Sequence, residues 1–502
     1  MDKVMERTPY DVWLNISRFI PRNVLSTLSA VNRSFYHIAA SIRFEVVTFY
    51  KFDRSTKWLC RNLCDPNIGR GHLVRRVNIE PWLVQPRPKP YHNRAEAIWN
   101  SIARLFDHDH SQRRMNQHVK RRIQKDITRV TDTVSGLSNL SEYGLRWNQH
   151  RPYHPELYQA FLCPVLSRIK DRLVKLSLDI PPEMLRSLAP IALPRLEHLE
   201  VGLCTMKMSR RDVDEVFDCF AVFVNNLYPT LESMSISSRV PSQSLDLTRF
   251  FTMLGTFPHL RRFCVSIPFD GTHLSSPCDL VAFLTKHRQT LQHLQLSSSR
   301  CSVAESPSSP KCKYWIPNIL SSLDTPFSRL SSVQLALRPV KADLTPILHF
   351  LAQHASELDC LNLTDRALTY NEVRTILNSI GACQAYSQLK QLRLRIHHLS
   401  ATFLTLLAQR LPRLAVLELS FVEVRVSAVA HMGYVGLTLA EEFDLFRTDI
   451  KENRDHYAQW EVGMFGISQG RSNEMLPALT ALLVDCLPAV QNIVELPPPA
   501  MF

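Results

Sequence analysis

A six-residue apolar pattern, L-x-x-L-x-L, recurs along most of this 502-residue chain. Its clear copies begin at Leu173, Leu196, Leu231, Leu260, Leu291, Leu330, Leu358, Leu389, Leu414 and Leu479, and weaker copies begin at Val74 and Leu140. From Leu173 to Leu414, eight steps cover 241 residues, or about 30 residues per repeat. This period predicts a stack of similar units, because a single unit of that size cannot bury its own apolar face.

Each repeat predicts one strand followed by one helix. The closing L-x-L of the pattern is typical of a short strand with one buried face. Helical spacing of apolar residues follows in residues 212–227, 247–255, 279–287, 344–355, 371–380 and 401–411. The sequence YAQWEVGMFGI at Tyr457–Ile467 predicts a further strand in the long gap before Leu479. The expected fold class is therefore α/β, an irregular solenoid of strand–helix units.

The stretch from Arg7 to Ala40 follows a different pattern, which predicts three short helices. Thr8 and Pro9 are suited to begin the first, with Thr8 as its cap, and Asn23 is suited to cap the second. The apolar stripes comprise Val12, Ile16, Phe19 and Ile20, then Val24, Leu25, Leu28 and Val31, then Phe35, Ile38, Ala39 and Ile42. Trp13 and Leu14 fall outside the first stripe, so that helix is apolar on more than one side. Because so short a segment has too little chain for a core of its own, we expect it to pack under the next domain or against another protein.

The same stretch resembles an F-box. The residues that carry the resemblance are Pro9, Tyr10-Asp11-Val12, Ile16, Phe19-Ile20-Pro21, Leu25, Leu28-Ser29, Val31-Asn32-Arg33, Phe35 and Ile38-Ala39. Thr8 stands where Leu is common in F-boxes, and Asp11 where Glu is common. The repeats resemble long leucine-rich repeats, although the Asn or Cys that follows the strand in that family is mostly absent; Cys204 is one fit. The chain as a whole resembles the divergent F-box/leucine-rich-repeat proteins of fungi.

This resemblance implies a non-enzymatic subunit that recognises targets for an SCF-type (Skp–cullin–F-box) ubiquitin ligase. The implied partners are a Skp-type adaptor, a cullin bound through that adaptor, and an unknown target protein on the repeats. We expect the adaptor to contact Pro9, Leu14, Ile16, Leu25, Leu28 and Val31. The alternative is a repeat scaffold without a ligase role, whose first helices only cap the solenoid. Exposure of the Leu14 and Ile16 face would favour the first hypothesis.

The expected organisation has four parts. Residues 1–46 form the F-box-like helices, and residues 47–135 form a linker and divergent first repeats that include a basic helix. Residues 136–495 form the leucine-rich-repeat-like solenoid, and residues 496–502 form a tail. A Pro-rich segment at residues 84–92 predicts an extended loop, and a Ser/Pro-rich segment at residues 297–313 predicts a disordered insertion.

The formal net charge of +13 permits an acidic partner or nucleic acid but requires neither. The clearest basic segment predicts a helix with the apolar stripe Met115, Val119, Ile123, Ile127 and Val130 and the cations Arg113, Arg114, Lys120, Arg121, Lys125 and Arg129. The simpler interpretation is a basic face exposed to solvent. The functional interpretation is a contact with an acidic partner or a phosphate group. Nucleic-acid binding ranks last among the functions considered.

We expect the chain to lie in the cytoplasm or the nucleus. No apolar run is long enough to cross a membrane, and the first residues lack the apolar core of a secretory signal. The 12 Cys have no repeating spacing and are expected to be reduced thiols.

No motif predicts catalysis, a cofactor or a metal. Glycine is scarce, and no phosphate-binding glycine loop is present. The DHDH sequence at Asp107–His110 offers adjacent residues that rarely converge on one ion. Cys60 and Cys64 have no matching second pair, and the paired His397 and His398 are expected in a surface loop.

Overall fold

A computed structural model describes residues 8–65, 69–84, 110–147, 155–203, 209–238, 245–268, 271–299, 315–337, 344–381, 388–425, 439–470 and 475–496. Two compact units divide the chain, Met1–Val201 and Gly202–Phe502. Fourteen described strands alternate with helices, and the strand pairs described within each unit are parallel and join sequence neighbours. The predicted α/β class is confirmed.

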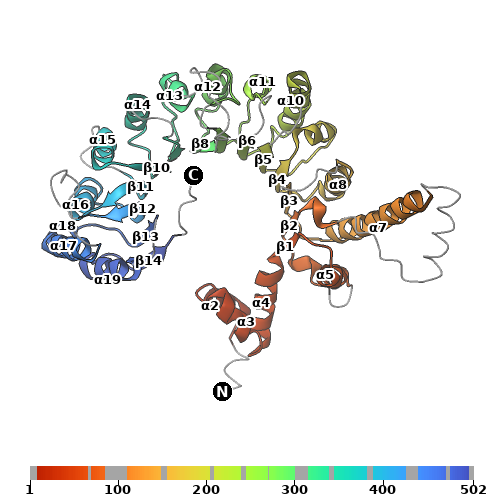
Figure 1. The fold of residues 1–502 in the computed structure, drawn as a ribbon, viewed down its shortest axis with the longest axis horizontal. Coiled ribbons are helices and arrows are strands. Elements are labelled where there is room, and N and C mark those ends of the chain that lie inside the picture. Colours follow the sequence, from red (N-terminus) through yellow and green to blue (C-terminus); the bar gives the residue numbers. More distant parts are fainter. Residues whose placement is uncertain are drawn as a thin grey trace. The chain divides into compact units, whose positions relative to one another are not determined.

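The first unit begins with three helices and continues as strand–helix repeats (Figure 1). Its elements are α2 (Tyr10–Ser17), α3 (Arg22–Leu28), α4 (Arg33–Glu45), β1 (Val46–Phe49), α5 (Arg54–Cys64), η1 (Gly71–Leu73), β2 (Arg76–Ile79), η2 (Pro81–Leu83), α7 (His110–Ser135), β3 (Glu142–Arg146), α8 (Pro155–Phe161), α9 (Cys163–Ile169), β4 (Lys175–Ile180) and η3 (Pro182–Leu188). β1 pairs with β2, β2 with β3 and β3 with β4, all in parallel. β5 (His198–Leu203) crosses the boundary between the units.

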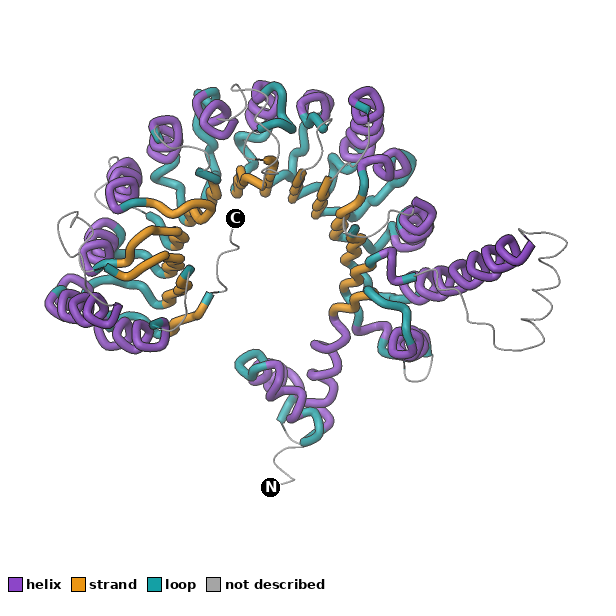
Figure 2. The backbone as a smooth tube through the Cα atoms, in the orientation of Figure 1, coloured by secondary structure: helices purple, strands orange, loops and turns teal. Residues whose placement is uncertain are grey.

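The second unit repeats the same strand–helix alternation to its end. Its elements are α10 (Arg210–Asn225), β6 (Ser233–Ser238), α11 (Thr248–Met253), β7 (Arg262–Pro268), α12 (Pro277–Lys286), β8 (His293–Ser299), α13 (Trp315–Ser321), β9 (Ser332–Leu335), α14 (Thr345–Gln353), β10 (Cys360–Leu368), α15 (Tyr370–Gly381), β11 (Gln391–Leu399), α16 (Ala401–Arg410), β12 (Val416–Val424), α17 (Leu439–Glu452), α18 (Arg454–Tyr457), β13 (Met464–Gln469), α19 (Leu476–Cys486) and β14 (Asn492–Glu495). In this unit the strands form one layer and the helices the other (Figure 2).

The repeated leucines hold the two layers together. One row of paired residues across β6 to β13 comprises Met234, Phe263, Leu294, Val333, Leu361, Leu392, Leu417 and Phe465. All eight side chains are buried against the helix layer. The first leucine of every clear repeat from Leu173 to Leu414 is also fully buried, because it turns in just before its strand. This continuous apolar row explains why the units stack.

The strand and helix predictions are confirmed for the repeats up to Leu414, and the strand predicted within Tyr457–Ile467 is confirmed as β13, which begins at Met464. The prediction at Leu479 is wrong, because that copy lies inside helix α19. Leu479, Leu482, Leu483 and Cys486 are buried at helical spacing, while Val484, the last apolar residue of the pattern, is exposed. A leucine pair three residues apart fits a helix as well as the start of a repeat, so the pattern alone is ambiguous here.

Two helix caps differ from the prediction. Helix α2 begins one residue later than expected, with Pro9 as its N-cap, and Pro21 caps α3; neither makes a side-chain capping bond. Thr8 and Asn23 therefore do not occupy the N-cap positions of these helices, and these predictions are wrong. The cap that the sequence reasoning missed is Asn32, whose side chain accepts a hydrogen bond from the Phe35 N–H at 2.8 Å.

Several predicted features lie outside the described residues. These are residues 85–92 of the Pro-rich segment, Asp107–Asp109, Cys204, residues 300–313 of the Ser/Pro-rich segment and residues 497–502 of the tail. The predicted basic helix is confirmed as α7, in which Ile127 and Val130 are buried and Ile123 is half-buried. The side chains of Met115 and Val119 belong to the part that is not described.

Candidate functional site

The three N-terminal helices share a small core of their own. Leu25, Phe35 and Ile38 are buried together, and the partly buried Trp13, Ile20, Leu28, Ala39 and Ile42 pack around them. The rings of Trp13 and Phe35 meet edge-on, with 5.0 Å between their centroids. The expectation that this segment has too little chain to close a core is therefore wrong, because one long helix, α4, provides a platform for two short ones.

Helix α2 leaves most of its apolar side chains in solvent. Its inner side carries Trp13 and Ser17, and Ile20 packs on the same side just beyond the helix end. Val12 and Ile16, with Phe19 in the turn that follows the helix, form an exposed apolar stripe. Phe19 is 88% exposed. The predicted core stripe of this helix is thus largely its solvent face, and the residues that fell outside or at the edge of that stripe do the packing.

Leu14 and Ile16 are both exposed, at 36% and 41%. They do not form one face, because residues two apart on a helix project about 200° from each other. Leu14 lies with Tyr10, one turn earlier, on one flank of α2. Ile16 belongs to the opposite flank with Val12. The helix therefore offers two apolar flanks rather than the single face that was expected.

The other predicted site residues divide by burial. Pro9 is exposed, Val31 is 55% exposed, and Leu28 is half-buried against the three-helix core. Leu25, however, is only 1% exposed and is packed into the three-helix core. We therefore assign Leu25 to the core of the segment and not to its surface. The exposed Val24, on α3, was not among the predicted contacts.

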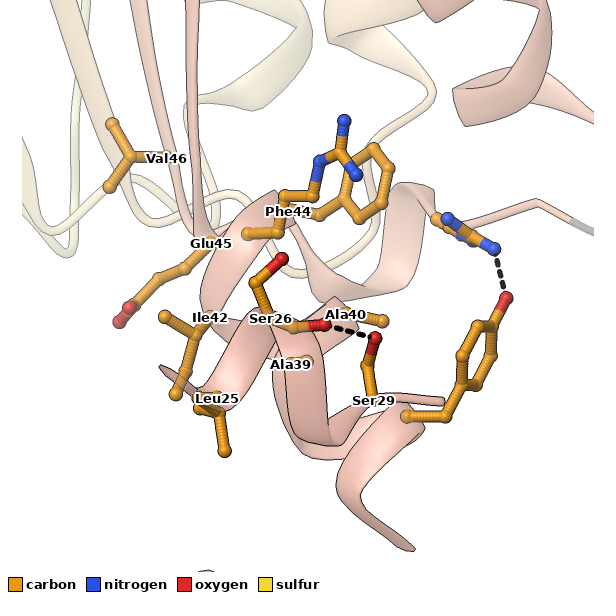
Figure 3. A pocket seen from close by; sticks show the side chains of 12 residues that line it. Leu25, Ser26, Ser29, Ala39, Ala40, Ile42, Phe44, Glu45 and Val46 are labelled. Carbon is orange, nitrogen blue, oxygen red and sulfur yellow. Dashed lines mark hydrogen bonds between the residues drawn. The ribbon is translucent and has the colours of Figure 1, made fainter. Parts of the chain in front are cut away.

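A hollow of about 430 Å³ lies beside α3 and α4 (Figure 3). Small side chains, Ser26, Ser29, Ala39 and Ala40, line it together with larger ones: Leu25, Tyr36, Ile42, Arg43, Phe44, Glu45, Val46 and Arg70. At its rim, the Arg70 guanidinium donates a hydrogen bond to the Tyr36 hydroxyl and lies 5.0 Å from the centroid of the Phe44 ring. The small residues leave room for a side chain from outside, and the Arg70 contacts keep the rim in place.

The contacts of α2 and α3 bear on the capping alternative. Both helices pack mainly against α4, and α4 in turn contacts β1 and η1 of the first repeats. A cap would place the apolar flanks of α2 and α3 over the end of the sheet. Instead, the apolar stripe of α2 is in solvent, and Val46 of the edge strand β1 is also exposed.

The strands of the second unit present a polar face on the side away from the helices. We call it the open sheet face. One row of this face runs through Ser235, Cys264, Gln295, Gln334, Asn362, Arg393 and Glu418, which are paired from strand to strand. Asn362 donates to Gln334 at 3.1 Å, and Arg393 and Glu418 form an ion pair at 2.9 Å. The face is uncharged along β6 to β10 in this row and becomes charged at β11 and β12. Sequence reasoning could not find these residues without knowing which side each strand presents.

The candidate metal and catalytic residues do not assemble. Among the described residues, no group of three His, Cys, Asp or Glu side chains is placed to hold a metal ion. Cys60 is buried and Cys64 is exposed, both on α5. His397 and His398 lie within strand β11, so their prediction as a loop is wrong; His398 is 3.9 Å from Glu423 of the neighbouring strand.

Across the described residues, no helix has the length and apolar content needed to span a membrane.

Comparison with known proteins does not assign this chain to a family. No family model matches its sequence, and no curated protein matches it significantly.

Proposed function

We propose that this chain is a non-catalytic target-recognition subunit of an SCF-type ubiquitin ligase. In this proposal, α2 and α3 dock on a Skp-type adaptor, which in turn binds a cullin, and the repeats hold a target protein. The observation that carries the proposal is the exposed apolar stripe Val12, Ile16 and Phe19 on a helical segment that already has its own core. Large exposed apolar side chains grouped on one element are typical of protein interfaces.

The hollow beside α3 and α4 supports the same assignment. Its lining of Ala and Ser side chains would accept an apolar side chain from the adaptor. Ile16 and Val31 would be central contacts, with Pro9 and Leu14 at the margin and Leu28 supporting the surface from the core. The F-box resemblance implies the class of the adaptor, and the exposed residues provide the surface to which that adaptor would bind.

The open sheet face is the surface that we assign to the target. A stack of short parallel strands presents side chains at regular spacing over a long distance, which suits a macromolecular partner better than a small molecule. The catalytic contribution of such a subunit is proximity: it holds the target near the ubiquitin-conjugating enzyme that the cullin recruits. No catalytic group is required from this chain.

The test is assembly of the complex from purified parts. The full chain, the Skp-type adaptor and a cullin are mixed and examined by sedimentation velocity. We expect one species that contains all three proteins, and no association of this chain with the cullin when the adaptor is left out. Separate sedimentation of a well-folded chain in the full mixture would reject the ligase proposal and favour the repeat scaffold whose first helices serve as a cap.

A further inference from the structure

Two neighbouring helices of the first unit, α5 and α7, gather an unusual number of unpaired cations. They are Arg54, Lys57 and Arg61 on α5 and Lys120, Arg121, Arg122, Lys125 and Arg129 on α7. Lys57 and Arg129 are half-buried, and the other six are exposed. Within the part of the chain that the structure describes, none of the eight forms an ion pair.

The two helices supply few acids to balance these cations. Neither contains Glu, α5 contains no Asp, and α7 contains only Asp126 and Asp132. Asp132 is already paired with Arg168 of α9 at 2.8 Å. Concentrating like charges on two adjacent helices opposes folding, since each cation raises the electrostatic energy of the others. Packing does not require the cations either, because the buried side of α7 is made by Ile127, Val130 and Val134.

Three of these cations line a groove that can receive a partner. This groove, of about 550 Å³, runs between the helices. Its lining comprises the cations Arg61, Lys125 and Arg129, the carboxylate of Asp132, and Cys64, Gln124, Thr128 and Thr133. The Cys60 thiol also lines the groove, and burial raises the pKa of that thiol, so the thiol itself adds no negative charge. An anionic group in the groove would meet cations from both helices, and the one carboxylate of the lining, Asp132, is already paired with Arg168.

An exposed tryptophan lies among the cations. Trp58 is 59% exposed and stands one helical turn from both Arg54 and Arg61 on α5. Exposed Trp beside Arg is a combination that contributes strongly to protein–protein binding. A partner that combines acidic and apolar side chains would use both features, whereas a nucleic-acid duplex is too wide for a groove of this size.

We infer that the groove between α5 and α7 is a docking surface for an acidic segment of a partner protein. We call it the basic groove; Arg61, Lys125 and Arg129 line it, and Trp58 and the other five cations lie on the same two helices. It lies on other elements than the proposed adaptor surface on α2 and α3, so the inference does not depend on the proposed function. Recognition would combine charge pairing to Arg and Lys with apolar contact to Trp58.

The test measures binding of a probe peptide to the full chain by fluorescence anisotropy. The probe is a fluorescein-labelled peptide of repeated Glu-Glu-Leu units, and a peptide of Gln-Gln-Leu units is its neutral control. We expect the Glu peptide alone to bind, with an affinity that falls as salt is added. A triple variant, Arg61→Glu, Lys125→Glu and Arg129→Glu, is expected to bind at least about tenfold more weakly. Trp58→Ala is expected to weaken binding without changing its salt dependence.

A matched control separates this site from bulk charge. Arg261→Glu, Arg288→Glu and Arg329→Glu change the net charge equally at exposed positions of the second unit. This control is expected to bind the Glu peptide nearly as the wild type does. If thermal unfolding shows that the charge-reversed triple variant is not folded, a neutral triple variant with Gln at the same three positions replaces it. This neutral variant is expected to lose affinity for the Glu peptide as well, but by a smaller factor. Equal weakening in groove and control variants, no binding of the Glu peptide at low salt, or tighter binding of single-stranded or duplex DNA than of the peptide would each overturn the inference.

Discussion

The imidazole of His287 joins two neighbouring repeats through the backbone of Phe257. Its Nε2 accepts a hydrogen bond from the Phe257 N–H at 2.9 Å, while its Nδ1 lies 2.8 Å from the carbonyl oxygen of Phe283. His354 repeats the arrangement with the Phe327 N–H at 2.9 Å and the Phe350 carbonyl at 2.7 Å. Each ring must therefore be neutral, with Nδ1 carrying the proton and Nε2 free to accept.

These histidines predict that acid destabilises the second unit. Burial lowers the pKa of both His287 and His354 below the ordinary value of 6.5. As the pH falls below 6.5, these histidines therefore bind protons in the unfolded chain before they do so in the folded chain. Their contribution to stability is therefore complete above pH 6.5 and is lost as the pH falls below that value. His293, whose pKa burial lowers to about 4, adds to the loss. Urea unfolding at pH 7.5 and pH 5 measures the effect, and we expect a lower midpoint at pH 5.

The variant His287→Phe tests the role of the ring nitrogens. The Phe257 N–H would be left buried without an acceptor, at a cost of about 1–3 kcal/mol in the free energy of unfolding. The variant is also expected to show a weaker pH dependence than the wild type, since one buried histidine is gone. An unchanged unfolding midpoint at pH 7.5 would contradict the described hydrogen bonding.

Replacing Leu25 with Ala is expected to unfold the three-helix segment rather than to remove a contact with the adaptor. Leu25 is fully enclosed by its neighbours, and a buried Leu→Ala change costs about 2–5 kcal/mol. Hydrogen exchange of residues 10–45 should therefore accelerate in Leu25→Ala. The exposed Ile16→Ala is the matched control and should leave exchange as it is in the wild type. Slow exchange in both variants would mean that Leu25 is not the core residue described here.

Helix α15 is expected to depend on its capping box. The Thr369 N–H donates to the Glu372 carboxylate at 2.8 Å, and the Glu372 N–H donates to the Thr369 hydroxyl at 3.3 Å. Arg366 also pairs with Glu372 at 2.7 Å. Thr369→Ala should lower the free energy of unfolding by about 1 kcal/mol, measured by urea denaturation, and Thr369→Ser should recover most of that loss. Equal stability of the Ala and Ser variants would argue against the box.

The sequence was most informative where burial is periodic. Leu173, Leu176 and Leu178 mark a repeat because all three are fully buried, and the same positions recur in each neighbour. Strands β1 and β14 were missed because they are short and β14 has little burial to give a periodic signal. The pattern at Leu479 misled because its spacing also suits a helix.

The candidate site was predicted less well than the fold. Periodicity identified an apolar stripe on α2, but it could not decide which flank would face α4, since Trp13 and Ile16 are both apolar. That choice follows from packing: Trp13 meets the Phe35 ring, and Ile16 is left in solvent. The residues of the open sheet face could not be predicted for a similar reason, because these polar residues show no periodic pattern until the register of the strands is known.

The most direct test of the account is a calorimetric titration of the full chain with the purified Skp-type adaptor. The wild type should bind, and the double variant Ile16→Asp and Val31→Asp should bind at least about tenfold more weakly while keeping the same thermal unfolding, since both side chains are exposed. The double variant Val222→Asp and Val484→Asp, which changes exposed valines of the second unit, should bind as the wild type does. Absence of binding by the folded wild type, or equal binding by all three proteins, would contradict the claim that α2 and α3 form the adaptor-docking surface.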